Sequence, residues 1–464
     1  MPAERGGPGT RKAQEAAKAE EIGVSLLTLQ TVEKLQAALH AKAKRSPGYR
    51  FYSLYDKVYR EDVLKLAYRR CRANGGAAGV DAQTFEDIGE YGETRWLSEL
   101  TEQLRRKEYW PSPVRRVWIP KTSGKLRPLG IPRITDRVVQ MAAVLVLEPI
   151  FEADLQPEQY AYRPGKGAHD AIRRVHSLLN TGHTQVIDAD LSGYYDSIPH
   201  SELMKSVARR VSDKQLLHLI KMWLEAPVEE TDERGNRRRT TRNKDEGRGT
   251  PQGAPISPLL SNLYMRRFVL GWRALGHERC FDAHIVNYAD DFVICCRGAA
   301  EEAMRIMRGI MGKLKLAVNE QKTRLCRVPE ETFDFLGYTI GRYYSTKTGK
   351  AYIGTCPSKK KVSSLCREIS EMTSRRWTLL PVEGKVAEIN RRLTGWSNYF
   401  CLGPVSKAYR AVDRHTCRRL RQWLCVKHKA GNRGVSRYPD EYLHRTLGLI
   451  KLPERTHSFS WATP

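Results

Sequence analysis

Residues 285–296 read IVNYADDFVICC, in which two apolar runs flank the tetrad from Tyr288 to Asp291. This pattern predicts a β-hairpin with the carboxylates of Asp290 and Asp291 at its tip. Adjacent carboxylates beside buried strands repel each other and lose hydration, and a bound cation would offset both costs. Mg²⁺ suits such a tip because it takes one or two carboxylates together with waters and phosphates. The alternative is an ordinary hairpin turn, in which Asp is common.

A second stretch that carries carboxylates, QVIDADLSGYYDSIPH, lies about a hundred residues earlier, at 185–200. Its alternation predicts a strand with Asp188 and Asp190 on one face and Ile187 and Leu191 on the other. The alternative is a strand end at which Asp and Ser cap the following helix. Three carboxylates on a strand and a nearby hairpin suit phosphoryl transfer with two Mg²⁺ ions, for which Mn²⁺ can substitute.

A basic hairpin is predicted for VRRVWIPKTSGKLRPLGIPRI, residues 114–134, with Lys121, Lys125 and Arg127 around its tip. Such a tip suits contact with phosphate, which arginine can bind through two parallel hydrogen bonds. A solvated charged turn is the alternative interpretation.

The stretch GTPQGAPISPLLSNLYM, residues 249–265, predicts a loop followed by a helix. Ser257 and Pro258 are typical of a helix start, with Ser257 as the N-cap and Pro258 in the first helical position. In the loop, Gly253 could let another backbone or a base approach closely, and Gln252 would lie beside that approach.

The composition points to a polyanionic partner. The 464 residues include 79 Lys and Arg against 52 Asp and Glu, a net charge of +27. Nucleic acid is the first expectation and an acidic membrane surface the second. Residues 341–464 hold 25 Lys and Arg against 8 Asp and Glu. Most of the excess positive charge therefore lies in this segment, which does not contain the carboxylate hairpin. The sequence therefore predicts a chemical centre joined to a basic binding segment.

Several classes are excluded by what the sequence lacks. No run of 18 apolar residues occurs, so we expect no membrane span. The first twenty residues have no apolar segment typical of a secretory signal. The ten cysteines contain no C-x-x-C pair, which argues against a disulfide framework and a zinc ribbon and favours a reducing cytoplasm. Strand–helix alternation from about 115 to 340 predicts an α+β sheet domain, and helical patterns dominate from Pro357 onward.

The order of the motifs resembles that of group II intron reverse transcriptases, also called maturases. The resemblance covers Phe51 to Leu449 and rests on nine blocks in the family order. These are NGGAAGVD, KTSGKLRPLGIP, YAYRPGKGAHDAI, DADLSGYYDSIPH, GTPQGAPISPLLSNLYM, YADD, NEQKTR, FDFLGY and LTGWSNYF.

The resemblance implies a right-hand polymerase with an antiparallel palm sheet. Residues 1–40 would be a partly disordered N-terminal extension, and 41–340 the fingers and palm. Residues 341–464 would be an α-helical basic thumb, called domain X, with a short basic tail. The implied partners are group II intron RNA in a ribonucleoprotein, an RNA template with a DNA primer, dNTPs and target DNA, with no membrane. The implied location is the bacterial cytoplasm, in association with the nucleoid.

The same resemblance implies the metal ligands. Asp190 matches the first catalytic ligand, favoured over Asp188 by the S-G-Y-Y-D that follows it, and Leu191 would offer its backbone carbonyl. Asp290 matches the second shared ligand. Asp291 matches the other half of the pair, which is bound less directly.

Further residues match positions around the nucleotide. Tyr195, five residues after Asp190, falls at the steric gate that favours dNTPs over ribonucleotides, where many relatives carry Phe. The other matches are Lys121 and Arg127 on the triphosphate, Gln252 with Gly253 beneath the nucleotide, and Lys322 as a proton donor to pyrophosphate or a phosphate ligand.

The sequence departs from many relatives in its last residues, which show neither an H-N-H run nor paired cysteines. We therefore expect no cleavage of target DNA by a domain of this chain. Two other functions stay open. One is an RNA-binding splicing cofactor whose polymerase is incidental, and the other is a host-adopted reverse transcriptase in defence or DNA repair.

Overall fold

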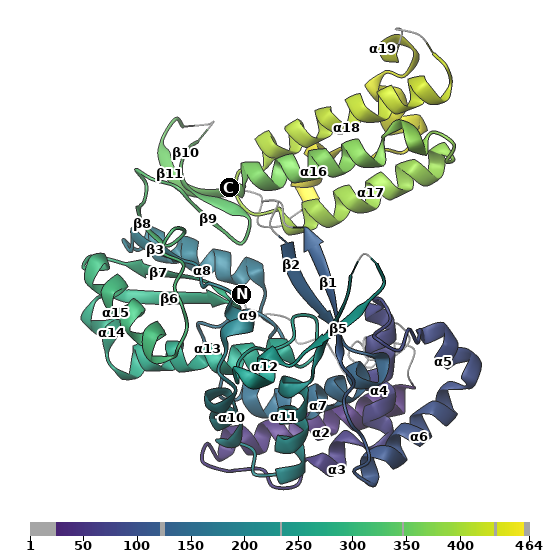
Figure 1. Ribbon diagram of the computed structural model, residues 1–464. Helices are drawn as coiled ribbons and strands as arrows, with labels where there is room; N and C mark the ends of the chain where they lie inside the picture. Colours follow the sequence, from purple (N-terminus) through teal and green to yellow (C-terminus); the bar gives the residue numbers. More distant parts are fainter. Residues whose placement is uncertain (1–24, 121–125, 233, 346–347, 431–433, 459–464) are drawn as a thin grey trace. The chain divides into compact units, whose positions relative to one another are not determined.

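The computed structural model describes residues 25–120, 126–232, 234–345, 348–430 and 434–458 (Figure 1). The chain forms two compact units, each assembled from separate stretches of sequence. The first comprises Met1–Lys166, Asp190–Gly276 and Arg305–Asn319, and the second comprises Gly167–Ala189, His277–Met304 and Glu320–Pro464.

The first unit is built around a helix that is buried on nearly every side. This is α7 (Ile134–Glu152), predicted over 136–151, and its apolar composition on all faces is typical of an interior helix. Helix α2 (Leu26–Arg45) lies against it, where the Gln36 side chain donates to the Leu145 carbonyl at 2.9 Å. Because α2 continues to Arg45, it crosses the predicted boundary at residue 40. The other helices of this unit are α3 (Tyr55–Val58), α4 (Glu61–Asn74), α5 (Phe85–Tyr91), α6 (Glu93–Arg105), α9 (Tyr194–Ser197), α10 (His200–Ala208), α11 (Lys214–Glu225), α12 (Arg242–Asp245) and α13 (Ser257–Ala274).

The sheet of the first unit has the order β2-β1-β4-β5. Strands β1 (Val114–Pro120) and β2 (Leu126–Ile131) pair antiparallel, which confirms the predicted basic hairpin. Its tip, 121–125, lies outside the described residues. Strand β1 also pairs in parallel with β4 (Val228–Thr231), which forms a hairpin with β5 (Arg237–Thr240).

The start of helix α13 differs from the prediction in one respect. The helix includes Ser257, and the N-cap is Ile256, so the expected capping role of Ser257 is wrong. The Ser257 hydroxyl donates instead to the Pro251 carbonyl at 2.9 Å, which ties the helix start to the preceding loop. Pro258 lies in the first turn, as the second helical residue and not the first as predicted.

The second unit contains the carboxylate hairpin within an antiparallel sheet of order β6-β7-β3-β8. Strands β6 (Ala283–Tyr288) and β7 (Asp291–Cys296) form the predicted hairpin, and β7 pairs with the predicted strand β3 (Gln185–Ala189). The remaining strand is β8 (Arg324–Arg327), and the associated helices are α8 (Ala168–Asn180), α14 (His277–Cys280) and the first residues of α15 (Ala300–Lys313). The two segments singled out in the sequence are therefore neighbours in one sheet.

A three-stranded sheet and a helical bundle complete the second unit. The strands are β9 (Phe333–Phe335), β10 (Tyr338–Tyr344) and β11 (Ala351–Pro357), and the long helices are α16 (Lys359–Met372), α17 (Val382–Tyr399) and α18 (Ser406–Lys427). Shorter elements follow or lie between them: η1 (Arg375–Trp377), α19 (Gly434–Arg437), η2 (Tyr442–Thr446) and η3 (Leu452–Ser458). The helices predicted after Pro357 are thus confirmed.

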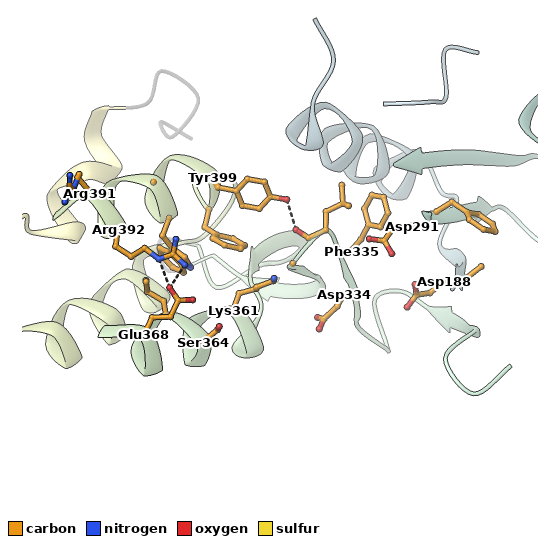
Figure 2. Close-up of a pocket in the computed structure, with 18 residues that line it drawn as sticks. Asp188, Asp291, Asp334, Phe335, Lys361, Ser364, Glu368, Arg391, Arg392 and Tyr399 are labelled. Carbon is orange, nitrogen blue, oxygen red and sulfur yellow. Dashed lines mark hydrogen bonds and ion pairs between the residues drawn. The ribbon is translucent and has the colours of Figure 1, made fainter. Parts of the chain in front are cut away.

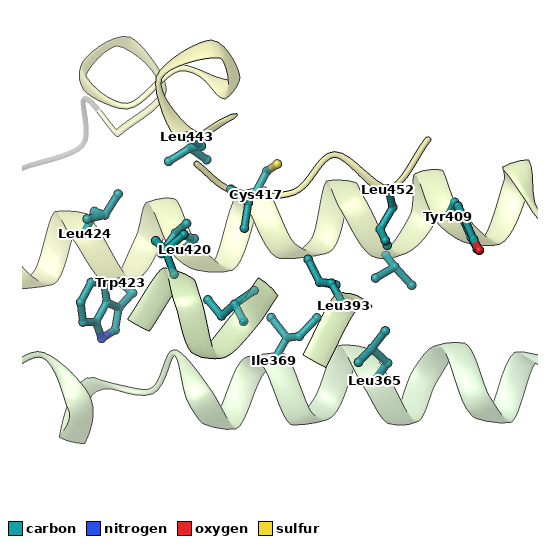
Figure 3. Close-up of a cluster of buried hydrophobic side chains, with 14 of the residues drawn as sticks. Leu365, Ile369, Leu393, Tyr409, Cys417, Leu420, Trp423, Leu424, Leu443 and Leu452 are labelled. Carbon is teal, nitrogen blue, oxygen red and sulfur yellow. The ribbon is translucent and has the colours of Figure 1, made fainter. Parts of the chain in front are cut away.

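One stripe of each long helix forms a common core (Figure 3). Ile369 of α16, Leu393 of α17 and Leu420 of α18 are each fully buried in it. Leu443 and Leu452 from the last segment join the same cluster, so that segment is part of the bundle. Among the described helices, none combines the length and the apolar composition that crossing a bilayer requires.

Candidate active site

In the first unit, Gln252 joins three segments that the sequence predicted to surround a nucleotide. The Arg127 Nε donates to the Gln252 Oε1 at 2.9 Å, and the Gln252 Nε2 donates to the Asp196 carboxylate at 3.4 Å. The Gln252 carbonyl also accepts the Gly130 N–H at 2.6 Å. Strand β2, the loop before α13 and helix α9 are therefore connected through this one residue.

Gly253 allows a close backbone approach, as predicted. Its φ is +110°, and a Cβ atom at this position would lie 2.5 Å from the Gly130 carbonyl oxygen. The predicted approach was by a backbone or a base, and here it is the backbone of β2. A side chain would collide with that carbonyl and would also strain the positive φ.

Tyr195 is buried, with 7% of its surface exposed. Its carbonyl accepts the Thr250 N–H at 2.7 Å, and its ring lies edge-on to Tyr194 with centroids 5.6 Å apart. These contacts fix the tyrosine backbone against the loop that carries Gln252. Its role as a steric gate stays a prediction.

Asp190 follows the last residue of β3 and is held by a segment that is distant in sequence. The Asn319 N–H donates to the Asp190 carbonyl at 2.8 Å, and the Asn319 side-chain amide donates to the carboxylate at 3.1 Å. Next along the chain, the buried Leu191 forms a β-bridge with Val318. Asn319 belongs to the NEQKTR block, of which only Lys322 was predicted as a site residue, so the contact of Asn319 with Asp190 was missed.

In the second unit, Asp290 lies in a two-residue turn that a buried amide supports. Ala289, the other turn residue, has a φ of +57°, and its carbonyl accepts the side-chain amide of Asn287 at 2.8 Å. Asn287 is 1% exposed, so this hydrogen bond satisfies a donor that would otherwise be buried at a cost. Asn287 was not predicted as a site residue, although it lies in the quoted hairpin.

A cavity of about 690 Å³ lies beside this hairpin, within the second unit (Figure 2). Asp188 and Asp291 line it from the sheet, and Tyr399 and two arginines, Arg391 and Arg392, line it from α17. Burial, followed by the nearby Tyr288 and Asp291, raises the pKa of Tyr399 to about 12, so its hydroxyl stays protonated at neutral pH. That hydroxyl donates to the Leu336 carbonyl at 2.9 Å.

Two further residues, Lys322 and Lys121, were predicted to contact phosphate. Lys322 is exposed and lies two residues before β8. Lys121 lies outside the described residues.

The predicted ligands fit a hard divalent cation, since they offer carboxylate and carbonyl oxygens alone. Arg324 lies 3.5 Å from the Asp188 carboxylate and offsets its charge. The Asp190 carboxylate accepts a hydrogen bond from the Asn319 amide. Asp190 belongs to the first unit and Asp290 and Asp291 to the second, so the combined ligand set stays a prediction.

Comparison with known proteins gives two family matches. Residues 119–340 match reverse transcriptase (RNA-dependent DNA polymerase), and residues 362–438 match the group II intron maturase-specific domain. The first match implies use of a divalent metal ion and the second implies binding of intron RNA.

Individual relatives agree with these matches. YkfC of Escherichia coli strain K12 is 34% identical over 366 residues, which cover 71% of this chain and 93% of YkfC. The group II intron-encoded protein LtrA of Lactococcus lactis is 27% identical over 62% of this chain and 57% of LtrA, so the chain spans little more than half of that relative. Among solved structures, a telomerase from Candida albicans aligns with 74% of this chain and 67% of its own at 13% identity and a TM-score of 0.39, too distant to add to the assignment. With its α+β reverse transcriptase domain followed by a helical maturase domain, the chain belongs to the family of group II intron reverse transcriptases and maturases.

Proposed function

We propose that this chain copies RNA into DNA at a site formed by Asp190, Asp290 and Asp291, and that it binds the RNA of its own group II intron. The strand register carries this proposal. The last pair between β3 and β7 is Ala189 with Phe292, and these two residues are the direct chain neighbours of Asp190 and Asp291. Asn319 and Asn287 support the proposal because they fix the backbone on which Asp190 and Asp290 are carried.

Asp190 and Asp290 would hold the Mg²⁺ ions, with Asp291 and the Leu191 carbonyl as additional ligands. When bound, the ions would neutralise charge on the phosphates and help to ionise the primer 3′-hydroxyl. The protein contributes oxygen ligands that the fold already holds in place. The repulsion between their negative charges is therefore offset by folding before the substrate binds.

The residues around Gln252 would hold the incoming nucleotide. Arg127, directed by Gln252, would bind the triphosphate together with Lys121, because a guanidinium donates in parallel to phosphate oxygens. The ring of Tyr195 would crowd a ribose 2′-hydroxyl and so favour dNTPs. Lys322 would protonate the leaving pyrophosphate or bind it.

The RNA-binding surface would belong to residues 341–464, as thumb and domain X, with 41–340 as fingers and palm and 1–40 as an extension. The positive net charge of residues 341–464 supports contact with the phosphate backbones of the intron RNA, the template–primer duplex and target DNA. Arg391 and Arg392 carry part of that charge at the cavity beside Asp291.

Extension of a DNA primer on an RNA template, with dNTPs and Mg²⁺, tests the polymerase part of this proposal. We expect full-length complementary DNA from the whole chain. Sequencing of the RNA that copurifies with the chain tests the partner, and we expect an RNA of group II architecture. A chain that promotes splicing of that RNA but extends no primer would replace the proposal with the splicing-cofactor alternative.

A further inference from the structure

A cluster of nitrogen and oxygen ligands lies in the second unit, at the end of β6 opposite to the Asp290 turn. His284 is the second residue of β6, Asp282 directly precedes the strand, and His183 lies two residues before β3. The His183 Nε2 is 3.1 Å from the Asp282 Oδ1, and the His284 Nε2 is 3.6 Å from the same oxygen. Potential ligand atoms of all three residues lie within 4.8 Å of one another.

The opposite ring nitrogen of each histidine faces an acceptor. The His284 Nδ1 lies 2.9 Å from the Glu278 carboxylate, which accepts and cannot donate when ionised. The His183 Nδ1 lies 3.1 Å from the Leu178 carbonyl and 3.1 Å from the Thr181 hydroxyl. That hydroxyl donates to the Leu178 carbonyl at 2.9 Å, so its oxygen is an acceptor toward the ring. Both histidines therefore carry a hydrogen on Nδ1.

The two Nε2 atoms therefore face one carboxylate oxygen, which can be accommodated by a hydrogen on Nε2 or by a cation. An unprotonated Nε2 would repel that oxygen, and protonation of both rings would place like charges at a centroid separation of 4.8 Å. Protonation of His183 alone would satisfy its contact at 3.1 Å but would leave an unprotonated His284 Nε2 at 3.6 Å from the same oxygen. A divalent cation between the three groups removes both conflicts. Arg297 lies 3.5 Å from the other Asp282 oxygen, so it balances charge without occupying the position between the histidines.

We propose that His183, Asp282 and His284 bind a zinc ion. Two imidazole nitrogens and one carboxylate oxygen form a donor set that zinc binds in proteins, whereas Mg²⁺ prefers oxygen alone. The hydrogen bond from His284 to Glu278 is the contact that orients a histidine ligand toward zinc, so Glu278 is a positioning residue. The side chains of Asp282 and His284 are 48% and 24% exposed, which leaves room for a water ligand and access for the ion.

The ion would link the segments that precede β3 and β6 in the sheet. His183 comes from the connection between α8 and β3, and its partner Asp282 is 99 residues later in the chain. A ligand that joins two such distant segments stabilises the folded state because it binds only when both are in place. Strand β6 separates the cluster from the Asp290 turn by six residues, about 20 Å of extended chain. The zinc ion would therefore not take part in phosphoryl transfer.

Zinc titration of the whole chain, after EDTA treatment and with Mg²⁺ present throughout, tests the site. We expect one equivalent of Zn²⁺ to bind and to raise the melting temperature, and Co²⁺ in its place to give visible d–d absorption. H183A and H284A should each weaken binding of that equivalent by more than about 100-fold, and E278Q by about 10–100-fold.

Two variants serve as matched controls. H218A removes an exposed imidazole from α11, and C417S removes a thiol that lies 3.5 Å from His444 in a separate cluster. Both should bind the tight equivalent as the unmodified chain does. The proposal is overturned if the chain binds no Zn²⁺, if H284A and E278Q both bind it unchanged, or if C417S alone abolishes binding. E278Q keeps the test decisive where a histidine variant fails to fold.

Discussion

Asn319 donates two hydrogen bonds to Asp190, one from its backbone to the carbonyl at 2.8 Å and one from its side-chain amide to the carboxylate at 3.1 Å. The two residues are 129 positions apart in the chain. A neutral donor fixes the orientation of the carboxylate without cancelling its charge, as a proposed metal ligand requires. Replacement of a residue that orients a metal ligand in this way commonly costs about 10–100-fold in metal affinity or activity.

N319A should lower the rate of primer extension about 10–100-fold, because the carboxylate of Asp190 would lose the donor that orients it. The backbone hydrogen bond would remain, so the melting temperature should change little. Single-turnover extension measures the effect, with N180A as a control that removes an exposed amide bonded to His176 in its own helix. Equal rates in N319A and N180A would show that Asn319 does not support the site.

G253A should destabilise the first unit by about 2 kcal/mol or more and lower DNA synthesis, since its Cβ would lie 2.5 Å from the Gly130 carbonyl oxygen. G89A is the matched control, because Gly89 lies in α5 with open space around the added methyl group. That control should be neutral or stabilising by up to about 1 kcal/mol. Thermal unfolding compares the two, and equal midpoints would contradict the close approach.

R127A should raise the KM for dNTPs about tenfold or more, because a charge-assisted contact with phosphate is worth about 1.5–3 kcal/mol. Q252A should give a smaller increase, since it removes only the acceptor that directs Arg127. R238A, on β5 of the same sheet, removes an exposed arginine as a control. Steady-state kinetics on an RNA template provide the comparison, and the assignment of Arg127 fails if R127A and R238A have the same KM.

The contribution of Glu202 to stability should depend on pH. Hydrogen bonds from Lys205 and then Arg267 lower its pKa from 4.5 to about 2 in the folded state. Its stabilising contribution is therefore fully present above about pH 4.5 and is lost as the pH falls toward 2. E202Q should be less stable by no more than about 1 kcal/mol at pH 7, because the ion pairs are near the surface. Denaturant unfolding should show a smaller difference at pH 3, and a difference that grows on acidification would contradict the sign.

The parts of the fold that could be predicted from the sequence are those with local signals. The hairpin at 285–296 has two apolar runs around a turn, and the strand before Asp190 alternates in polarity with the period of a strand; both are confirmed. Asn319 and Asp196 were missed because their partners depend on tertiary contacts that no local pattern marks. Asn287 was missed although its partner, the Ala289 carbonyl, is only two residues away. Ser257 was assigned a capping role by its residue type, whereas the Pro251 carbonyl competes for its hydroxyl.

The same reason explains why the histidine cluster was not predicted. Asp282 and His284 are two residues apart, but His183 is 99 positions from Asp282, and this spacing matches no metal motif. The family resemblance did not indicate this cluster, because the residues it matches lie at the opposite end of the same strands.

The rate of RNA-templated primer extension by D290N tests the central claim most directly. D290N should lower that rate by about 1,000-fold or more, because Asp290 is proposed to hold the catalytic ions, and D291N should lower it less. D334N, which removes a carboxylate from the cavity that Asp291 lines, should extend the primer at the rate of the unmodified chain. Extension by D290N at that same rate, or abolition by D291N while D290N stays active, would contradict the account.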